Sequence, residues 1–370
     1  MINQYLDAMI TDGVSDLYLT VGRAASLRGE AGLYTVGDVL SESDMAALLA
    51  SFLHPDQITR FQEERELNTS IDRGVNGRFR VNIMRQKNNP AIVIRHVLSQ
   101  IPDFESLGLP PLFRGLSMAK RGLILVTGVT ASGKSTTLAS MLDYRNQHDR
   151  GHIITIEDPI EYFHDHKESV VSQREVGIDT ESFAAALKNA LRQRPDVILI
   201  GEIRDRTVME HALTIAETGH LALATLHTTN AYQTIERVIN FFPEEQAAQI
   251  RLNLALNLRA IVSQRLVPSV DGHLVLAQEV LLNDGLVKEL ILNGEILKIR
   301  ELLEQNRAMG MCSFDQSLLD LYTEGRITEE VALSYSDRPG DLKIKIKNYA
   351  INQREGKFNL MDTGDLRISD

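Results

Sequence analysis

The sequence predicts an α/β protein in which a small N-terminal α/β domain precedes a larger domain with a mostly parallel sheet. The chain of 370 residues is 43% hydrophobic, which is enough for a large core, and its length favours two domains. Short apolar runs also recur along its middle, separated by helical patterns, and they cover 123–127, 153–156, 197–200 and 221–226. This alternation is typical of a parallel sheet covered by helices on both faces.

Residues 1–98 are predicted to form the N-terminal domain, because helical and strand patterns alternate there without a phosphate-binding loop. The helical patterns cover 2–10, 41–53 and 55–66, and the strand patterns cover 78–84 and 91–97. A turn-rich spacer, Lys87-Asn88-Asn89-Pro90, joins the two strands. Residues 99–112 contain three prolines and a glycine, and are predicted to be the linker to the next domain.

The larger domain is predicted to span 113–340, with helices at 135–145, 181–194 and 206–218. After Pro243 the chain is expected to be mainly helical, and Ser313 and Gln316 fit a capping box at the start of one helix. Residues 341–370 are a predicted tail. Within it, lysines alternate with apolar residues over 342–347, which favours a solvated edge strand or a partly disordered end, with a partner-binding strand as the alternative.

Composition argues against several classes of protein. A formal net charge of −11 disfavours a nucleic-acid groove, because binding to phosphate backbones depends on clustered Lys and Arg. The single cysteine, Cys312, excludes an intrachain disulfide and a four-cysteine zinc site, and fits a reducing cytoplasm. No Lys or Arg precedes Arg23 and no apolar run approaches membrane-spanning length, so neither a secretory signal nor direct membrane insertion is expected.

The most specific signal is a G-x-x-x-x-G-K-[ST] loop that follows the apolar run 123–127 and opens a helical pattern. Its backbone N–H groups and the positive end of the helix dipole suit phosphate oxygens. Lys134 is predicted to reach the β- and γ-phosphates, and the Ser135 hydroxyl is predicted to bind Mg²⁺. The predicted nucleotide-binding residues are Gly128, Thr130, Ser132, Gly133, Lys134, Ser135 and Thr136.

Carboxylates follow two further apolar runs. Glu202 comes just after 197–200, where P-loop enzymes keep the acid that holds the Mg²⁺ shell, and is predicted to be a metal ligand together with Ser135. Glu157, Asp158 and Glu161 follow 153–156, and such a cluster suggests the handling of Mg²⁺ or water. Spacing alone does not decide which of these three acids does chemistry.

Two histidines, His220 and His227, flank the run 221–226 and are therefore expected at opposite ends of one strand. Each of them, taken alone, is more often a hydrogen-bonded core residue than a catalyst. The presence of both beside one strand favours a functional role, and their spacing is not that of zinc ligands.

These motifs, in order along residues 1–340, resemble those of secretion-type ATPases, and most closely the type IV pilus retraction ATPases. The matching segments are Gly128 to Thr136 (Walker A), Ile156 to Glu161 (Asp box), Gly201 to Asp205 (Walker B), Thr218 to His227 (His box), Arg78 to Asn82 and Arg174 to Gly177. The resemblance implies a PAS-like N-terminal domain and a RecA-like ATPase domain with a helical C-terminal part. It also implies a homo-hexameric ring that binds ATP and Mg²⁺ at its subunit interfaces.

Roles for single residues follow from the same resemblance. Arg80 and Arg95, with Arg78 as a further candidate, would contact the γ-phosphate. Glu161 would be the general base and Glu202 the Walker B glutamate. His220 and His227 would couple the nucleotide to domain motion. The implied partners are a sister retraction ATPase and an inner-membrane pilus platform protein, with the ring in the cytoplasm and peripheral to the membrane.

The chain departs from the retraction family in two places. Lys288 and Leu292 stand where that family usually has arginines, and neither offers the bidentate fork of a guanidinium. The extra tail is the second departure. Both point to an accessory motor that acts beside a primary retraction ATPase. A nucleotide-binding adaptor ring without catalysis is the alternative, although every catalytic position is intact. A nucleic-acid translocase is disfavoured by the acidic charge.

Overall fold

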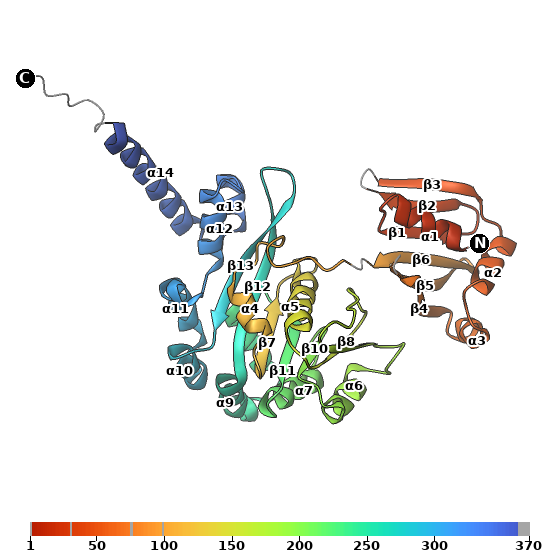
Figure 1. Ribbon diagram of the computed structural model, residues 1–370, viewed down its shortest axis with the longest axis horizontal. Helices are drawn as coiled ribbons and strands as arrows, with labels where there is room; N and C mark the ends of the chain where they lie inside the picture. Colours follow the sequence, from red (N-terminus) through yellow and green to blue (C-terminus); the bar gives the residue numbers. More distant parts are fainter. Residues whose placement is uncertain (1, 30–31, 75–76, 98–99, 362–370) are drawn as a thin grey trace, which may run out of the picture. The chain divides into compact units, whose positions relative to one another are not determined.

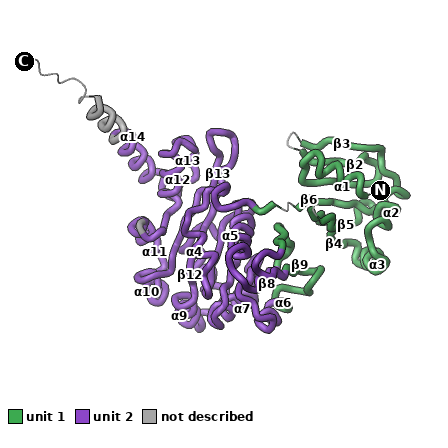
Figure 2. Tube along the Cα trace, viewed as in Figure 1, with its two compact units in different colours: residues 1–101, 157–165, 173–185 green, residues 102–156, 166–172, 186–370 purple. Residues whose placement is uncertain are grey.

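The chain forms two units in the computed structural model, which describes residues 2–29, 32–74, 77–97 and 100–361 (Figures 1 and 2). Unit 1 consists of the chain up to Ile101 together with Glu157–Asp165 and Gln173–Ala185, and unit 2 contains the rest. Unit 1 therefore combines the N-terminal region with two segments from much further along the sequence. The first of these segments, Glu157–Asp165, carries the acidic cluster of Glu157, Asp158 and Glu161.

Unit 1 contains an antiparallel sheet whose six described strands are ordered β3-β2-β1-β6-β5-β4. The strands are β1 (Asp16–Thr20), β2 (Ala24–Gly29), β3 (Gly32–Val39), β4 (Glu66–Asp72), β5 (Arg78–Gln86) and β6 (Asn89–Val97). Their apolar side chains form one core with the helices α1 (Ile2–Thr11), α2 (Glu42–Ala50) and α3 (Pro55–Glu64). The three predicted helices and both predicted strands are confirmed.

Strand β5 shows how the sequence divides this sheet into two faces. Phe79, Val81 and Ile83 are completely buried in the core. Because successive side chains of a strand point to opposite faces, Arg78 and Arg80 lie on the other face. The arginines named above are therefore displayed away from the core of unit 1.

The second sheet is mixed, and its seven described strands are ordered β13-β12-β7-β11-β10-β8-β9. The strands are β7 (Gly122–Thr127), β8 (His152–Glu157), β9 (Val170–Glu175), β10 (Val197–Ile200), β11 (Leu221–Leu226), β12 (Leu258–Pro268) and β13 (Leu274–Leu282). The neighbours from β12 to β8 are parallel, and β13 is antiparallel to β12. The predicted α/β class and all four predicted strands of this region are confirmed.

The expectation of a mainly helical chain after Pro243 is confirmed for most of this region, but it missed β12 and β13, which form the longest strand pair of the sheet. Polar residues such as Ser263 and Gln264 interrupt the apolar run of β12 and conceal it in the sequence. Both are buried in the structure, where Ser263 Oγ accepts a hydrogen bond from Thr127 and Gln264 Nε2 donates one to Thr137.

Helices line the second sheet and extend beyond it (Figure 1). They are α4 (Leu112–Ser117), α5 (Lys134–His148), α6 (Phe183–Ala190), α7 (Arg206–Glu217), α8 (Ala231–Asn240), α9 (Ala247–Asn257), α10 (Leu286–Asn293), α11 (Ile299–Gln305), α12 (Phe314–Thr323), α13 (Glu329–Tyr335) and α14 (Pro339–Met361), with short 3-10 turns at Leu191–Gln193, Glu244–Gln246, Ile296–Lys298 and Arg307–Met309. The capping box of Ser313 and Gln316 is confirmed at the start of α12. None of the described helices is both long enough and apolar enough to cross a bilayer.

The tail corrects the sequence analysis, because 342–347 form part of helix α14 and not a strand. Leu342 and Ile346, four residues apart, are buried against a cluster formed with α12 and α13, whereas Ile344 is 60% exposed. The pattern that looks like strand alternation is therefore one buried stripe of a helix. Residues 362–370 of the predicted tail lie outside the described residues.

Candidate nucleotide-binding and catalytic site

Four parallel strands of unit 2 end at one edge of the sheet, here called the carboxyl edge. Thr127 of β7 lies opposite Leu226 of β11, and Ile200 of β10 lies opposite Ile156 of β8. The residues that follow these strands therefore reach the same edge. In open α/β sheets this edge is the usual place for a ligand.

The phosphate loop connects β7 to α5 at the carboxyl edge, and its backbone requires glycine at two places. Gly128 has a φ of 149°, and a Cβ there would overlap Ser132 Oγ and lie 2.6 Å from the carbonyl oxygen of Gln264. Gly133 has a φ of 92° and caps the N-terminus of α5. The two predicted glycines are thus the residues that let the loop close on itself.

The polar groups of this loop fit a phosphate. The Lys134 side chain is only 7% exposed, and its Nζ donates to the carbonyl oxygens of Gly128 (2.9 Å) and Val129 (2.8 Å). Ser132 Oγ is buried and has no hydrogen-bond partner among the described residues. Ser135 and Thr136 are half-buried in the first turn of α5, and Thr130 is exposed in the loop. A cation, an unsatisfied hydroxyl and a helix N-terminus therefore meet at one point, which suits an anionic phosphate.

Two buried polar residues of β12, which the sequence did not single out, form hydrogen bonds on both sides of the phosphate loop. Thr127 Oγ1 donates to Ser263 Oγ at 2.9 Å, and Gln264 Nε2 donates to Thr137 Oγ1 at 2.7 Å. These bonds tie β12 to the residue before the loop and to the helix after it. The only sequence signal was a polar pair within an otherwise apolar stretch.

The structure brings Glu202 and His227 together at the carboxyl edge. One residue, Gly201, separates Glu202 from the end of β10. One carboxylate oxygen of Glu202 lies 3.2 Å from His227 Nε2, and the other lies 2.9 Å from Arg204 Nε. His227 directly follows β11. Among the described residues, no group of three or more His, Cys, Asp and Glu side chains could hold a metal ion by itself.

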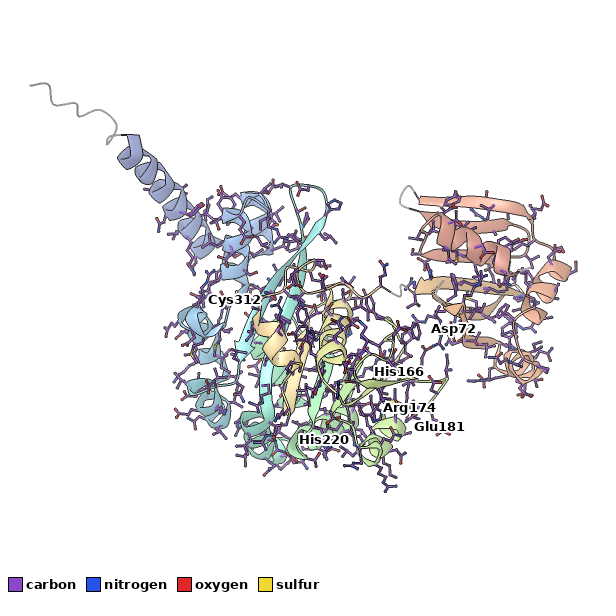
Figure 3. The ribbon with its side chains drawn as sticks, in the orientation of Figure 1. Asp72, His166, Arg174, Glu181, His220 and Cys312 are labelled. Carbon is purple, nitrogen blue, oxygen red and sulfur yellow. The ribbon has the colours of Figure 1, made fainter. Side chains whose placement is uncertain are left out.

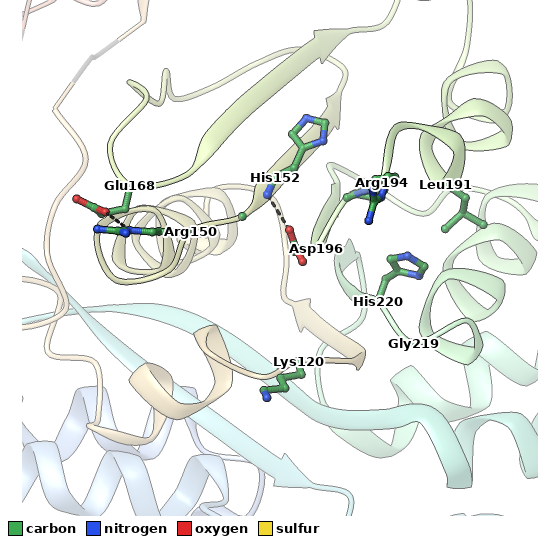
Figure 4. A pocket seen from close by; sticks show the side chains of 11 residues that line it. Lys120, Arg150, His152, Glu168, Leu191, Arg194, Asp196, Gly219 and His220 are labelled. Carbon is green, nitrogen blue, oxygen red and sulfur yellow. Dashed lines mark hydrogen bonds and ion pairs between the residues drawn. The ribbon is translucent and has the colours of Figure 1, made fainter.

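His220 lies at the other end of β11, as its spacing predicts. Leu221 pairs with Gly122 at the start of β7, so the six residues of β11 separate the two histidines by about 20 Å. His220 Nδ1 is 3.1 Å from Thr218 Oγ1, and the ring lines a pocket of about 700 Å³ that also includes Lys120, Arg194 and Asp196 (Figures 3 and 4). The structure thus keeps His220 away from the phosphate loop.

Arg80 and the acidic cluster belong to the same unit, and their charges interact. Arg80 and Arg95 are cross-strand partners of β5 and β6. Burial lowers the pKa of the Arg80 guanidinium, while the carboxylates of Glu175, Asp158 and Glu161 oppose this shift and the Arg95 charge adds to it. Arg95 instead donates to Asp16 at 2.8 Å. Arg80 therefore faces the segment that carries Glu161, whereas Arg95 is paired inside its own sheet.

Strand β13, the neighbour of β12, carries a buried carboxylate, Glu279. Glu279 is 4% exposed, is the cross-strand partner of Ser263, and accepts a hydrogen bond of 2.7 Å from the N–H of Ala231, the first residue of α8. Burial raises the pKa of Glu279 to about 7, although the Ala231 N–H lowers it in part. Glu279 thus anchors the helix that follows the His227 loop.

This shift predicts a specific dependence of stability on pH. Because the folded-state pKa of Glu279 exceeds the ordinary value of 4.5, the folded protein binds the proton more tightly than the unfolded chain does. The stabilisation is complete below about pH 4.5 and is lost as the pH rises through 7, by on the order of 3 kcal/mol. Unfolding of wild type and Glu279→Gln between pH 4 and 8 measures it. The free energy of unfolding of Glu279→Gln, relative to that of wild type, should rise as the pH rises. If the two free energies change with pH in parallel, the pKa of Glu279 is not raised in the folded protein.

Comparison with known proteins identifies the family. Residues 2–306 match the family model described as type II/IV secretion system protein. The chain is 45% identical to the type IV pilus ATPase PilU of Pseudomonas aeruginosa, over 99% of this chain and 96% of that protein. It is 39% identical to the type IV pilus retraction ATPase PilT of the same species, over 90% of this chain and 96% of that protein.

Solved structures agree with this result. A crystal structure of the pilus retraction motor PilT with bound ADP superposes with a TM-score of 0.86, at 42% identity, and covers 92% of this chain and 98% of that one. The Legionella pneumophila ATPase DotB gives a TM-score of 0.78 at 26% identity, covering 90% and 93%. The resemblance stated from the motifs is confirmed. The chain belongs to the type II/IV secretion system protein family, within its branch of type IV pilus retraction ATPases.

Proposed function

We propose that this ATPase works as a homo-hexameric ring that converts ATP hydrolysis into mechanical retraction of a type IV pilus. The observation that carries the proposal is the phosphate loop, closed at Gly128 and holding the buried Lys134 at the carboxyl edge, the edge that Glu202 also reaches. The ring would work in the cytoplasm on an inner-membrane platform protein, as an accessory motor beside a sister retraction ATPase. The similarity to PilU and PilT along nearly the whole chain supports this placement.

The domain organisation is part of the same proposal. Residues 1–98 would be a PAS-like domain joined by the linker 99–112 to a RecA-like domain at 113–340, with 341–370 as an appended tail. The antiparallel sheet of unit 1 and the mixed sheet of unit 2 support two different folds.

The proposed chemistry gives each candidate residue a role. Lys134 and the N–H groups of the loop would bind the β- and γ-phosphates of ATP. Glu161 would accept a proton from the attacking water, and Arg80 would stabilise the charge that grows on the γ-phosphoryl group until ADP and phosphate separate. Ser135 and Glu202 would hold Mg²⁺, with water and phosphate oxygens as its other ligands. Mg²⁺ neutralises negative charge on the phosphates when it is bound.

A genetic experiment tests the cellular role. In a strain that lacks the gene, we expect pilus retraction against load to weaken. The wild-type gene should restore it, and Lys134→Ala should not. Equal restoration by both versions would mean that the protein contributes to retraction without using ATP.

A further prediction concerns Arg80. Arg80→Ala should still bind ATP but hydrolyse it roughly 10³-fold more slowly, because an arginine of this kind stabilises charge that appears only in the transition state. Phosphate release and binding of a fluorescent ATP analogue by the purified protein measure the two effects.

Mixed rings sharpen this test. Since the charges of Arg80 and Glu161 interact within one chain, the two should serve the same nucleotide. A mixture of Arg80→Ala and Glu161→Gln subunits should therefore remain inactive, and recovered activity would contradict the pairing. A mixture of Arg80→Ala and Lys134→Ala subunits should recover activity only if the arginine and the phosphate loop of one site come from different chains.

A further inference from the structure

Glu175 is a buried carboxylate that none of the proposed catalytic steps uses. It is the last residue of β9, is 8% exposed and belongs to unit 1. Its Oε2 accepts a hydrogen bond of 3.2 Å from the backbone N–H of Ile160. A buried ionisable group is costly unless its neighbours compensate it, so its surroundings bear on its purpose.

One side of Glu175 faces the segment that carries the proposed base. Ile160 is 3% exposed and immediately precedes Glu161. A hydrogen bond at Ile160 therefore fixes the backbone from which the Glu161 side chain projects, while Glu161 itself is exposed. A general base needs this support, because it must be held within hydrogen-bond reach of the proton that it accepts.

The charges of Arg78 and Arg80 on β5 also act on Glu175. Burial raises the pKa of the Glu175 carboxyl, and the Ile160 N–H together with the charges of Arg78 and Arg80 lowers it again. Arg78 also lies 4.8 Å from the ring centre of Phe163, on the Glu161 segment, and its buried Nε has no hydrogen-bond partner among the described residues. Glu175 thus supplies negative charge where two guanidinium groups approach this segment.

The backbone of Glu175 is itself held in place. Its N–H donates to Asp179 Oδ2 at 2.8 Å, and its carbonyl oxygen accepts from the N–H of Asp179 at 2.8 Å. This closed turn keeps the carboxylate directed toward Ile160 and β5. The contacts on both sides therefore form one connected arrangement within unit 1.

We propose that Glu175 is a positioning residue for ATP hydrolysis, which holds the Glu161 segment and the β5 arginines in a single geometry. The inference rests on the proposed roles of Glu161 and Arg80 and adds a residue that touches neither ATP nor water. Its effect should appear in turnover more than in nucleotide affinity, because base and arginine act in the transition state while the phosphate loop binds the ground state.

Two substitutions separate the two contacts. Glu175→Gln keeps an oxygen that can accept from Ile160 but removes the charge that faces the arginines, and should lower kcat about tenfold with the KM for ATP changed less than about twofold. Glu175→Ala removes both, and should lower kcat roughly a hundredfold, the loss expected from a misplaced catalytic group. Glu181→Gln is the matched control. Glu181 is an exposed residue of the same segment, Gln173–Ala185 (Figure 3), and this substitution should leave kcat unchanged.

Hydrogen exchange gives a readout that is independent of activity. The amide of Ile160 should exchange at least about tenfold faster in Glu175→Ala than in wild type, and at nearly the wild-type rate in Glu175→Gln and Glu181→Gln. A residue with only a structural role would lower the melting temperature and leave kcat intact. If Glu175→Ala fails to fold, Glu175→Gln carries the test alone.

A double-mutant cycle completes the experiment. Arg80→Ala combined with Glu175→Gln should be no slower than Arg80→Ala alone within about threefold, because Glu175→Gln removes only the charge that acts on the arginine. The proposal is overturned if the kcat losses of the two single variants multiply in the double variant. It is also overturned if Glu175→Gln is as active as Glu181→Gln. If wild type and Glu181→Gln both fail to hydrolyse ATP, the proposed function has failed instead, and the exchange of Ile160 still tests the anchor.

Discussion

Lys134→Ala is expected to abolish ATP hydrolysis and to weaken nucleotide binding by roughly a hundredfold. The Lys134 ammonium is buried on the carbonyl oxygens of the phosphate loop, and no other side chain of 128–136 is cationic. A hydrogen bond from a charged donor contributes about 1.5 to 3 kcal/mol, which corresponds to roughly ten- to a hundredfold in affinity. In addition, the charge on the γ-phosphoryl group would lose its nearest counter-charge in the transition state.

Phosphate release and titration with a fluorescent ATP analogue measure these two losses. Lys120→Ala is a suitable control, because Lys120 is an exposed lysine of the same unit that lines the pocket at the opposite end of the strands. The control should behave as wild type. Unchanged phosphate release by Lys134→Ala would refute the assignment of the phosphate loop.

Glu161→Gln is expected to keep ATP and Mg²⁺ bound while turnover falls by about two orders of magnitude or more, the contribution of a well-placed general base. Gln keeps the size of the side chain and removes only its ability to accept the proton. The comparison is with Glu157→Gln and Asp158→Asn in the same acidic cluster. If Glu161→Gln hydrolyses ATP normally and one of these two is inactive, the base has been assigned to the wrong carboxylate.

Strands buried on both faces could be predicted from the sequence because they read as unbroken apolar runs. The runs 197–200 and 221–226 appear in the structure with the same bounds, as β10 and β11. Strand β12 could not be found in this way, since Ser263 and Gln264 break its apolar run. Their burial depends on Thr127 and Thr137, which come from elements more than a hundred residues earlier.

The tail was mispredicted for a related reason. The spacing of Leu342, Ile344 and Ile346 fits a strand, and the pair four residues apart fits a helix equally well. The helix is favoured over the strand because side chains of α12 and α13 cover Leu342 and Ile346 and leave Ile344 exposed. Tertiary packing of this kind is not visible in a local pattern.

Some residues of the candidate site could be predicted from the local sequence, and others could not. Local spacing predicted the phosphate loop, and the order of strands and acids predicted Glu202 near the end of β10. Glu175 lies in the matching segment Arg174 to Gly177, but its surroundings could not be predicted from spacing, because Ile160 and Arg80, which act on it, come from two other parts of the chain. The roles of Glu161, Arg80, Arg95, His220 and His227 remain predictions.

If the proposed catalytic roles are right, copies of this chain hydrolyse ATP without any second motor protein. Steady-state phosphate release by the purified protein alone, with ATP and Mg²⁺ and without the sister retraction ATPase, tests it most directly. We expect phosphate release that depends on ATP and disappears in both Lys134→Ala and Glu161→Gln. ATP binding without phosphate release, with turnover appearing only after the sister motor is added, would contradict it and identify the protein as a nucleotide-binding adaptor.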